Sequence, residues 1–443
     1  MSIRLREKGA SRGVRVPENK ITAERPIEVF PLPEKVIIPL HQNIGAPCDA
    51  IVKRGDKVLT GQSIGSSEKF VNAPVHATIS GEITATTMVI NPPTGQSVTA
   101  VVITSDGEDR WVELDVPSLP DALSAEEILG RIRRAGLVGM GGATFPTHVK
   151  LQPPKGKEID TVILNGCECE PYITSDYRVM LEYGEKVLSG LNIIRKVLSP
   201  ANVYIAIEDN KEDAIEHVEK LVASMGFGDD FKIVPLRSKY PMGAEKTLIE
   251  IVLGREVPIG GLPLDVGVVV HNVSTAKAIH EAVFEGKPFI ERVVTVTGAV
   301  RQPKNLMVRL GTPLRSLIEY CGGMDEAAGE VILGGPMMGI AQPDLDFPVT
   351  KGTSCVLVRE RLPIREQVCI SCGQCVEVCP MRLVPTMLAK CAKAGRYNIC
   401  RETYYIDDCF ECGACSYTCP ANIPIVQYVK VAKSELARRK AKK

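Results

Sequence analysis

The sequence predicts a multidomain α/β protein in which a β-rich part, an α/β part, a small α+β part and a cysteine-rich helical part follow one another. Three observations predict this order. The first 120 residues are rich in Val, Ile, Gly and Pro and carry no long helical pattern. Apolar runs then alternate with helical stretches. Finally, ten of the fifteen cysteines fall between Cys369 and Cys419, eight of them in two regularly spaced runs.

The composition limits the possible functions of these 443 residues. The 53 Lys and Arg residues balance the 53 Asp and Glu residues, which excludes the strongly basic composition of a general nucleic-acid binder. No apolar run approaches the roughly 18 residues of a bilayer-spanning helix, and the N-terminus lacks the apolar stretch of a secretory signal. We therefore expect a cytoplasmic protein whose membrane association, if present, is peripheral.

Residues 1–120 are expected to form a β barrel-sandwich. The glycine-punctuated phrase 55–65 resembles the sandwich domains that carry biotin or lipoate on a hairpin lysine. Here the hairpin position holds Lys69 between Glu68 and Phe70, without the Met-Lys pair usual in those carriers. We therefore expect an unmodified domain with a structural or docking role.

Residues 121–290 are expected to form an α/β domain with a parallel sheet. Ser124 and Glu127 make a capping box at the start of a helix that Gly136 would end. Strands are expected at 161–164, 203–207, 232–234 and 266–270, and helices at 211–225 and 243–253. Because open α/β sheets bind ligands at the carboxyl ends of their strands, the residues just after these runs are candidate site residues.

The remaining segments differ from this domain in composition. Residues 291–358 return to strand patterns around one helical segment, which favours a small β-grasp domain. Its strands are expected at 292–297, 306–310 and 331–333 and its helix at 314–320. Residues 359–425 hold the cysteine runs within helical sequence, and residues 426–443 are expected to be a basic tail.

Two cysteine runs share the spacing C-x2-C-x2-C-x3-C-P. They are Cys369, Cys372, Cys375, Cys379 and Pro380, and Cys409, Cys412, Cys415, Cys419 and Pro420. Bacterial two-cluster ferredoxins have this run, and the fourth cysteine of each run ligates the other cluster. We therefore predict an α-helical ferredoxin-like domain with two [4Fe–4S] clusters, in which Cys419 joins the first three cysteines and Cys379 joins the second three. Zinc is the less favoured alternative.

A glycine-rich loop lies at residues 135–150 and follows an expected helix rather than a strand. This placement argues against the standard dinucleotide fingerprint. Even so, Gly139, Gly141 and Gly142 would let the backbone approach a flat ring or a phosphate, and Lys150 adds positive charge. The loop is therefore a candidate cofactor site.

Three further segments each follow an apolar run and precede a helix. They are residues 165–171, 240–246 and 271–275. We expect them to meet the glycine-rich loop at one edge of the sheet. In the first of them Cys167 and Cys169 flank Glu168 and are candidate functional thiols, whereas buried free thiols are expected for the five isolated cysteines.

These segments resemble the flavin subunit of respiratory complex I, which carries G-R-G-G-A-G-F-P-T-G-x-K, N-A-D-E-G-E-P, G-E-E and N-V-E-T in the same order. With two ferredoxin runs behind them, they are more similar to the C-subunit family of the Rnf electron transport complex, and this resemblance covers nearly the whole chain. It implies that FMN contacts Gly139, Gly141, Gly142, Lys150, Asn165, Asn272 and Thr275. It also implies that NADH or the flavin ring lies near Glu168, Glu170 and Glu245. The alternative is that these three acidic residues are solvated side chains at helix starts, where the helix dipole favours negative charge. Departures from the complex I pattern are Met140, Thr144, His148, Cys167, Cys169 and Ser274.

The resemblance implies an NAD-dependent oxidoreductase and translocase subunit. NADH gives two electrons as a hydride and an iron–sulfur cluster takes one at a time, so a flavin is needed between them. We expect a membrane-associated, ion-translocating NADH:ferredoxin oxidoreductase, in which this chain passes electrons between NAD(H), FMN and two [4Fe–4S] clusters. Its expected partners are the other subunits of that complex and, indirectly, ferredoxin, at the cytoplasmic face of the inner membrane. A soluble cobalamin-reducing flavoprotein of the same family and a non-enzymatic iron–sulfur relay or scaffold are the alternatives.

Overall fold

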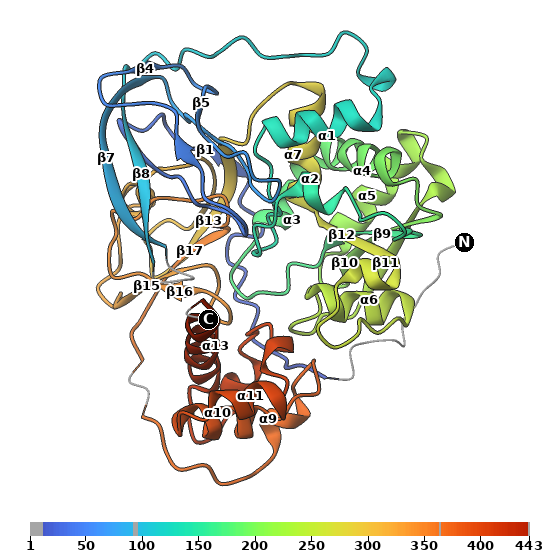
Figure 1. Cartoon of the computed structure of the whole chain (residues 1–443), viewed down its shortest axis with the longest axis vertical. Helices are drawn as coiled ribbons and strands as arrows, with labels where there is room; N and C mark the ends of the chain where they lie inside the picture. Colours follow the sequence, from blue (N-terminus) through green and yellow to red (C-terminus); the bar gives the residue numbers. More distant parts are fainter. Residues whose placement is uncertain (1–11, 92–95, 363–364, 442–443) are drawn as a thin grey trace.

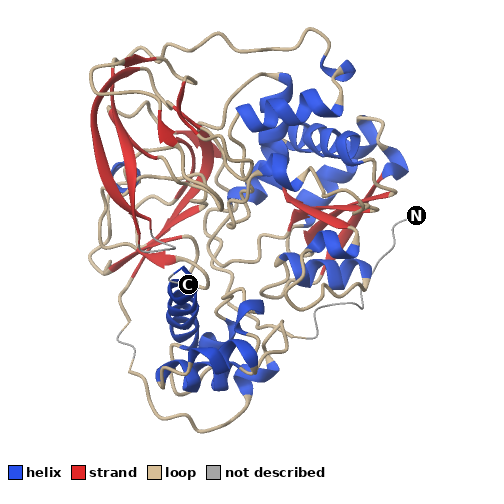
Figure 2. Ribbon diagram, viewed as in Figure 1, coloured by secondary structure: helices blue, strands red, loops and turns tan. Residues whose placement is uncertain are grey.

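The computed structural model describes residues 12–91, 96–362 and 365–441 and has four parts in chain order (Figure 1). The β-rich parts lie beside the α/β part, and the cysteine-rich helical part lies across one end of the molecule (Figure 2). This architecture agrees with the predicted fold class.

The first part is a two-sheet β sandwich. One sheet has the strand order β2-β8-β7-β4 and the other β3-β5-β6. The strands are β2 (Lys35–Pro39), β3 (Asp49–Ala50), β4 (Lys57–Val58), β5 (Ser63–Ser66), β6 (Val75–His76), β7 (Gly81–Asn91) and β8 (Gln96–Ser105). Side chains such as Ile38, Ile64 and Ile103 are buried in its core, because alternate residues of a strand point to the same face.

The N-terminal segment, residues 12–29, lies outside this sandwich, which differs from the expected domain 1–120. Its Gly13 N donates to Val378 O in the helical part (3.0 Å), and its Val14 N donates to Tyr240 O in the α/β part (2.8 Å). Strand β1 (Ile27–Val29) then joins the sheet of the third part in parallel with β14. A strand of three residues carries no periodic signal, so the sequence does not reveal this pairing.

The second part is an α/β domain with four parallel strands in the order β11-β10-β9-β12. The strands are β9 (Thr161–Gly166), β10 (Asn202–Glu208), β11 (Phe231–Leu236) and β12 (Val268–Asn272). The helices are α1 (Ala125–Arg134), α2 (Thr147–Lys150), α3 (Ser175–Glu182), α4 (Gly184–Leu198), α5 (Glu212–Ser224), α6 (Glu245–Leu253) and α7 (Val273–Phe284), with 3-10 turns η1 (Pro120–Ala122), η2 (Gly228–Asp230) and η3 (Pro263–Val266). The predicted capping box of Ser124 and Glu127 is present. Gly190 allows α4 to approach α7, since a Cβ there would lie 1.8 Å from Ala276 O.

The third part has the predicted β-grasp architecture. Its sheet has the order β1-β14-β13-β17-β15-β16, with β13 antiparallel to β14 and parallel to β17. Its elements are β13 (Glu291–Gly298), β14 (Lys304–Arg309), α8 (Leu314–Tyr320), β15 (Glu330–Leu333), β16 (Ile340–Ala341) and β17 (Cys355–Arg359). Leu314, Leu317 and Ile318 of α8 are buried, because they form the apolar face that packs on the sheet.

The fourth part is helical and has an internal repeat. Its helices are α9 (Gln374–Glu377), α10 (Pro385–Lys393), α11 (Tyr397–Glu402), η4 (Ile406–Asp408), α12 (Ala414–Tyr417) and α13 (Ile425–Ala441). Helices α9 and α12, and likewise α10 and α13, begin 40 residues apart. The residues expected as a basic tail form α13 up to Ala441, because Val429, Ala432 and Leu436 fall on one helical face and are buried in this part. Residues 442–443 lie outside the described range.

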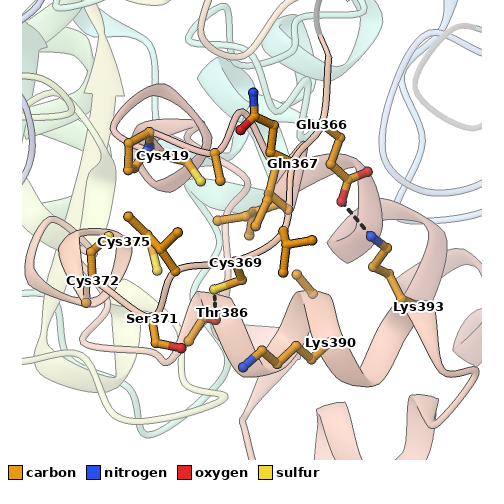
Figure 3. Close-up of a pocket in the computed structure, with 18 residues that line it drawn as sticks. Glu366, Gln367, Cys369, Ser371, Cys372, Cys375, Thr386, Lys390, Lys393 and Cys419 are labelled. Atoms are coloured by element: carbon orange, nitrogen blue, oxygen red, sulfur yellow. Dashed lines mark hydrogen bonds and ion pairs between the residues drawn. The ribbon is translucent and has the colours of Figure 1, made fainter.

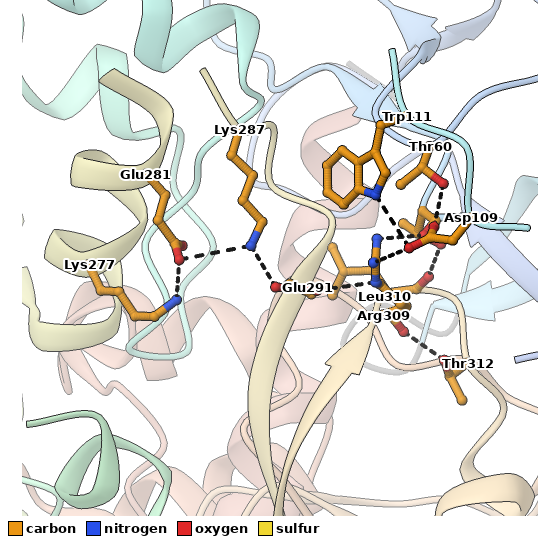
Figure 4. Close-up of polar contacts among 11 residues, drawn as sticks. Thr60, Asp109, Trp111, Lys277, Glu281, Lys287, Glu291, Arg309, Leu310 and Thr312 are labelled. Atoms are coloured by element: carbon orange, nitrogen blue, oxygen red, sulfur yellow. Dashed lines mark hydrogen bonds and ion pairs between the residues drawn. The ribbon is translucent and has the colours of Figure 1, made fainter. Parts of the chain in front are cut away.

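A network of ion pairs joins the first three parts (Figure 4). Arg309 of β14 binds Asp109 of the sandwich part at 2.8 Å and Glu291 of β13 at 3.1 Å. Lys287 binds Glu291 at 2.6 Å and lies 3.9 Å from Glu281 of α7. These side chains are less than a third exposed, so solvent weakens their interactions less than those of surface pairs. The network therefore helps to fix the sandwich and β-grasp parts against the α/β part.

Candidate functional site

The carboxyl ends of β9 and β12 bring two candidate residues together. Asn165 and Asn272 are direct partners in the parallel register. Asn165 Nδ2 donates to Gly243 O at 2.8 Å, and Asn165 Oδ1 accepts from Cys167 N at 2.9 Å. These contacts bring together the three segments that were expected to meet at one edge of the sheet.

The glycine-rich loop lies over the start of α7. Met140 N donates to Thr275 Oγ1 at 2.9 Å, and Asn272 Oδ1 caps α7 by accepting from the backbone of Ser274 and Thr275. A Cβ added to Gly141 would be in ordinary contact with Asn272, 3.6 Å from its Cβ.

The exposed side of this loop has room for a ligand. Gly142 has φ +108° and would meet nothing within 4 Å of an added Cβ. The loop therefore exposes backbone beside a helix N-terminus, which fits a flat ring or a phosphate.

Lys150 and Glu245 form an ion pair near the same edge. Their Nζ and Oε1 atoms are 2.5 Å apart, and both side chains are partly exposed. Nearby His271 is buried, and its Nε2 has no hydrogen-bond partner among the described residues. Burial, together with the charge of Lys150, holds the pKa of His271 well below its usual value, so this imidazole is neutral. The edge thus offers an ion pair and one unsatisfied ring nitrogen.

Glu168 is buried and caps a helix. Its carboxylate accepts hydrogen bonds from Ser175 Oγ, Asp176 N and Tyr177 N at the start of α3 (3.1, 2.8 and 3.2 Å). Burial raises the pKa of Glu168, and the charge of Lys20 opposes this shift. The helix N-terminus therefore already engages the carboxylate that was expected to lie near NADH or the flavin.

Lys20 and Asp176 are two polar residues that sequence reasoning did not single out. Lys20 Nζ donates to three backbone carbonyls around Glu168, including Ile173 O at 2.6 Å. Asp176 accepts from Asn272 Nδ2 at 2.6 Å and from the hydroxyl of Ser274 at 2.5 Å. Asp176 lies in the first turn of a helix, an ordinary place for an acidic residue, so its sequence position gave no signal.

Glu170 reaches the β-grasp part. Its Oε1 accepts from the backbone N–H groups of Met337 and Met338 at 2.7 and 3.0 Å, and burial raises its pKa. Next to it, Tyr240 is only 2% exposed and donates its hydroxyl to Cys412 O at 2.6 Å. Through these contacts the edge of the α/β sheet touches the second cysteine run.

The first set of predicted cluster ligands lines a cavity of about 590 Å³ (Figure 3). Cys369, Cys372 and Cys375 lie there with Cys419 from the second run, as the ferredoxin spacing predicts. Cys372 is exposed, so this cavity is open to solvent. A cavity with four thiols from two loops fits a [4Fe–4S] cluster.

The second set packs against other parts of the chain. Cys379 lies near Cys409, Cys412 and Cys415, and all but Cys409 are buried. Cys412 belongs to an apolar cluster with Tyr240 and the N-terminal segment. This group of four thiols also fits a [4Fe–4S] cluster.

Both cysteine runs have the same backbone conformation. Positive φ angles recur at the same positions, in Ser371 and Glu411, Gly373 and Gly413, and Arg382 and Asn422. The two runs therefore differ in their surroundings more than in their local fold.

Cys167 and Cys169 are both placed in packed surroundings. Cys167 is buried and its Sγ lies 3.6 Å from Ala206 O, whereas Cys169 packs in the apolar cluster that includes Cys412. Burial raises the pKa of both thiols, which disfavours the reactive thiolate form. Their functional role stays a prediction.

Fold and site together define a flavin and iron–sulfur protein. Five family models match the chain: the Nuo51 FMN-binding domain at 132–281, the RnfC barrel sandwich hybrid domain at 8–108, the SLBB domain at 293–341, and 4Fe-4S binding domains at 362–382 and 406–422. They confirm the fold class predicted from the sequence.

Curated relatives identify the family more closely. The C subunit of the proton-translocating ferredoxin:NAD(+) oxidoreductase complex of Clostridium ljungdahlii is 49% identical over 94% of this chain and 91% of its own length. The C subunit of the Na(+)-translocating complex of Acetobacterium woodii is 44% identical over 89% of this chain and 90% of its own length. The chain belongs to the C-subunit family of ion-translocating oxidoreductase complexes, as its motifs predicted.

The chain also has a distant structural neighbour. An NAD+-reducing [NiFe]-hydrogenase of known structure aligns over 75% of this chain and 67% of its own, with a TM-score of 0.49 and 19% identity. Within the described residues, no helix combines the length and apolar character needed to cross a membrane.

Proposed function

We propose that this chain is the NAD(H)-reacting flavin and iron–sulfur subunit of a membrane-associated, ion-translocating ferredoxin:NAD(+) oxidoreductase complex. The FMN-binding and 4Fe-4S family matches support this proposal, as do relatives named for that activity over nearly their whole length. The same relatives disfavour the cobalamin-reducing flavoprotein and the non-enzymatic scaffold.

The glycine-rich loop and the strand ends are the proposed FMN site. The backbone of Gly139, Gly141 and Gly142 would face the cofactor, and Lys150 would supply positive charge. Asn165, Asn272 and Thr275 hold this loop and the strand ends together through the hydrogen bonds described above. FMN bound here would convert between the hydride of NADH and single electrons. Glu245 is the acidic candidate that remains partly exposed at this edge, so we assign it a contact with the nucleotide.

The observation that carries this proposal is the contact between Tyr240 and Cys412. It places the second set of cysteines directly against the α/β part, while the first set opens to solvent. We therefore propose that the cluster held by Cys379, Cys409, Cys412 and Cys415 is nearer the flavin. The cluster held by Cys369, Cys372, Cys375 and Cys419 would then face the partner subunit.

We also propose that the chain lies peripherally on the cytoplasmic face of the inner membrane and reaches ferredoxin through other subunits. Helix α13 carries Arg438, Arg439 and Lys440 in its last turn. Such charges attract anionic lipid headgroups by about 1 kcal/mol each near the surface. We expect membrane fractionation when all subunits are co-expressed and soluble protein when the chain is expressed alone. Mainly soluble protein beside its partners would contradict the proposed location.

Anaerobic reduction of the purified chain tests the proposed function directly. We expect about eight iron atoms and non-covalent FMN per chain. NADH should bleach the flavin absorbance and then the iron–sulfur absorbance in stopped-flow measurements. A chain that holds both cofactors but stays oxidised with excess NADH would refute the proposal, and a chain without flavin would favour the scaffold alternative.

A further inference from the structure

The sandwich part extends a loop, residues 67–72, to the edge of the glycine-rich loop. His148 of α2 lies against it: His148 Nε2 is 3.0 Å from Phe70 O, and the two rings meet edge to face with centroids 5.6 Å apart. Burial lowers the pKa of His148, so the neutral ring donates from Nε2 to the carbonyl. This contact gives a structural reason for His148, one of the departures from the complex I pattern.

The loop 67–72 is held firmly in place. Ala46 N donates to Val71 O at 2.9 Å, and Asn72 Nδ2 donates to Ala46 O at 2.8 Å. Gly45 has φ +126°, and a Cβ there would lie 2.2 Å from Val71 O, so the two loops need glycine to approach this closely. The neighbouring Ile44 N donates to Thr144 O of the glycine-rich loop at 3.2 Å.

Despite this rigid support, two large apolar side chains here stay in solvent. Phe70 is 51% exposed and Ile44 is 53% exposed. Positive charge is close by, because Lys69 precedes Phe70 and the charge of Arg133 acts on His148. A half-exposed aromatic ring beside cationic side chains suits a purine base joined to phosphate groups.

We infer that Phe70, supported by Ile44, forms the wall on which the adenine of NAD(H) stacks. The inference rests on the proposed function, which places FMN at the glycine-rich loop and the strand ends and the nucleotide beside Glu245. A dinucleotide that starts there and passes the exposed Gly141 and Gly142 meets the sandwich loop next. The exposed Lys69 and Arg133 would supply positive charge for its diphosphate. This gives the sandwich part a role in substrate binding.

A comparison of NADH with reduced nicotinamide mononucleotide separates adenine binding from the reaction of the nicotinamide. Phe70→Ala should raise the KM for NADH by about ten-fold or more, since base stacking on an aromatic ring is lost. Its flavin content should not change, and neither should its kinetics with reduced nicotinamide mononucleotide, which lacks the adenylate half. Phe70→Tyr keeps the ring and should stay within about two-fold of wild type. Met88→Ala, a truncation of another exposed side chain on β7, is the matched control.

Binding of ADP-ribose, measured by calorimetry, gives a readout without turnover. Phe70→Ala should weaken it by the same factor as it raises the KM for NADH. Equal ADP-ribose binding by wild type and Phe70→Ala would overturn the inference, as would an equal loss with both reduced nucleotides. If the wild-type chain reacts with neither reduced nucleotide, the proposed function fails separately, and ADP-ribose binding still decides the role of Phe70.

Discussion

Two glycines at equivalent places in the cysteine runs allow a controlled test of how the helical part is held. Gly373 and Gly413 have φ values of +80° and +81°, so alanine costs roughly 1–2 kcal/mol of backbone strain at either position. Their surroundings differ. A Cβ on Gly373 would meet nothing within 4 Å, whereas a Cβ on Gly413 would lie 2.6 Å from Met337 O.

The expected difference follows from that distance. Carbon and oxygen atoms seldom approach closer than about 3.3 Å, so Gly413→Ala must push the turn at Met337 away. Displacements of this kind cost about 1–3 kcal/mol. In Gly413→Ala, the contact between the second cysteine run and the turn at Met337 should therefore open about 5 to 150 times more often than in Gly373→Ala.

Hydrogen exchange of the cluster-loaded chain measures this opening. Amides of residues 334–339 and 409–419 should exchange faster in Gly413→Ala than in Gly373→Ala by that factor. Iron content serves as the control for cluster loss, since both substitutions lie in cluster loops. Equal exchange in the two variants would show that the β-grasp turn does not hold the second cysteine run, and would refute this reasoning.

Three further substitutions test the site, and a fourth tests the stability of the sandwich part. Tyr240→Phe leaves the carbonyl of a cluster loop without its donor, which costs about 1–3 kcal/mol, and should slow iron–sulfur reduction after flavin reduction in stopped-flow traces. Gly141→Val should fold normally but lose FMN, because its Cβ has ordinary contacts and its extra methyl groups fill the ligand space; unchanged flavin content would reject the site. Glu245→Gln should slow NADH oxidation about ten- to hundred-fold, against no change for an exposed glutamate of α5. Burial lowers the pKa of His76 to about 3, so its neutral form stabilises the fold above pH 6.5, and this contribution is lost as the pH falls. Between pH 7 and pH 5 the free energy of unfolding of the wild type should therefore fall by about 2 kcal/mol more than that of His76→Gln. Urea unfolding followed by the fluorescence of the single tryptophan, Trp111, measures both values, and equal pH slopes in the two proteins would contradict the prediction.

The sequence was most informative where the structural signal is local. Each apolar run predicted as a strand in the α/β part lies at one of its four parallel strands, because buried parallel strands need continuous apolar residues. The capping box at Ser124 and the cysteine spacing are equally local patterns. The basic composition of the last residues led to the prediction of a tail where helix α13 forms, although Val429, Ala432 and Leu436 recur at helical spacing.

Long-range contacts were beyond the reach of sequence patterns. Glu168 and Glu170 looked alike in the motif, yet one caps α3 and the other binds the β-grasp turn. Lys20 reaches the same region from about 150 residues away, and no local pattern marks it. Which acidic residue of a motif stays open to a ligand is decided by such distant partners.

The N-terminal segment, residues 12–29, constrains the timing of biosynthesis. Arg12 Nη1 donates to Val376 O at 3.1 Å, across a separation of 364 residues. A ribosome adds about 5–20 residues per second, so this contact waits roughly 20–70 s after Arg12 is made. The α/β partners of Val14 and Lys20 are synthesised during that interval, whereas Arg12 and Gly13 reach their partners Val376 and Val378 only after the first cysteine run is made. Synthesis of the first cysteine run is therefore what allows Arg12 and Gly13 to form their final contacts.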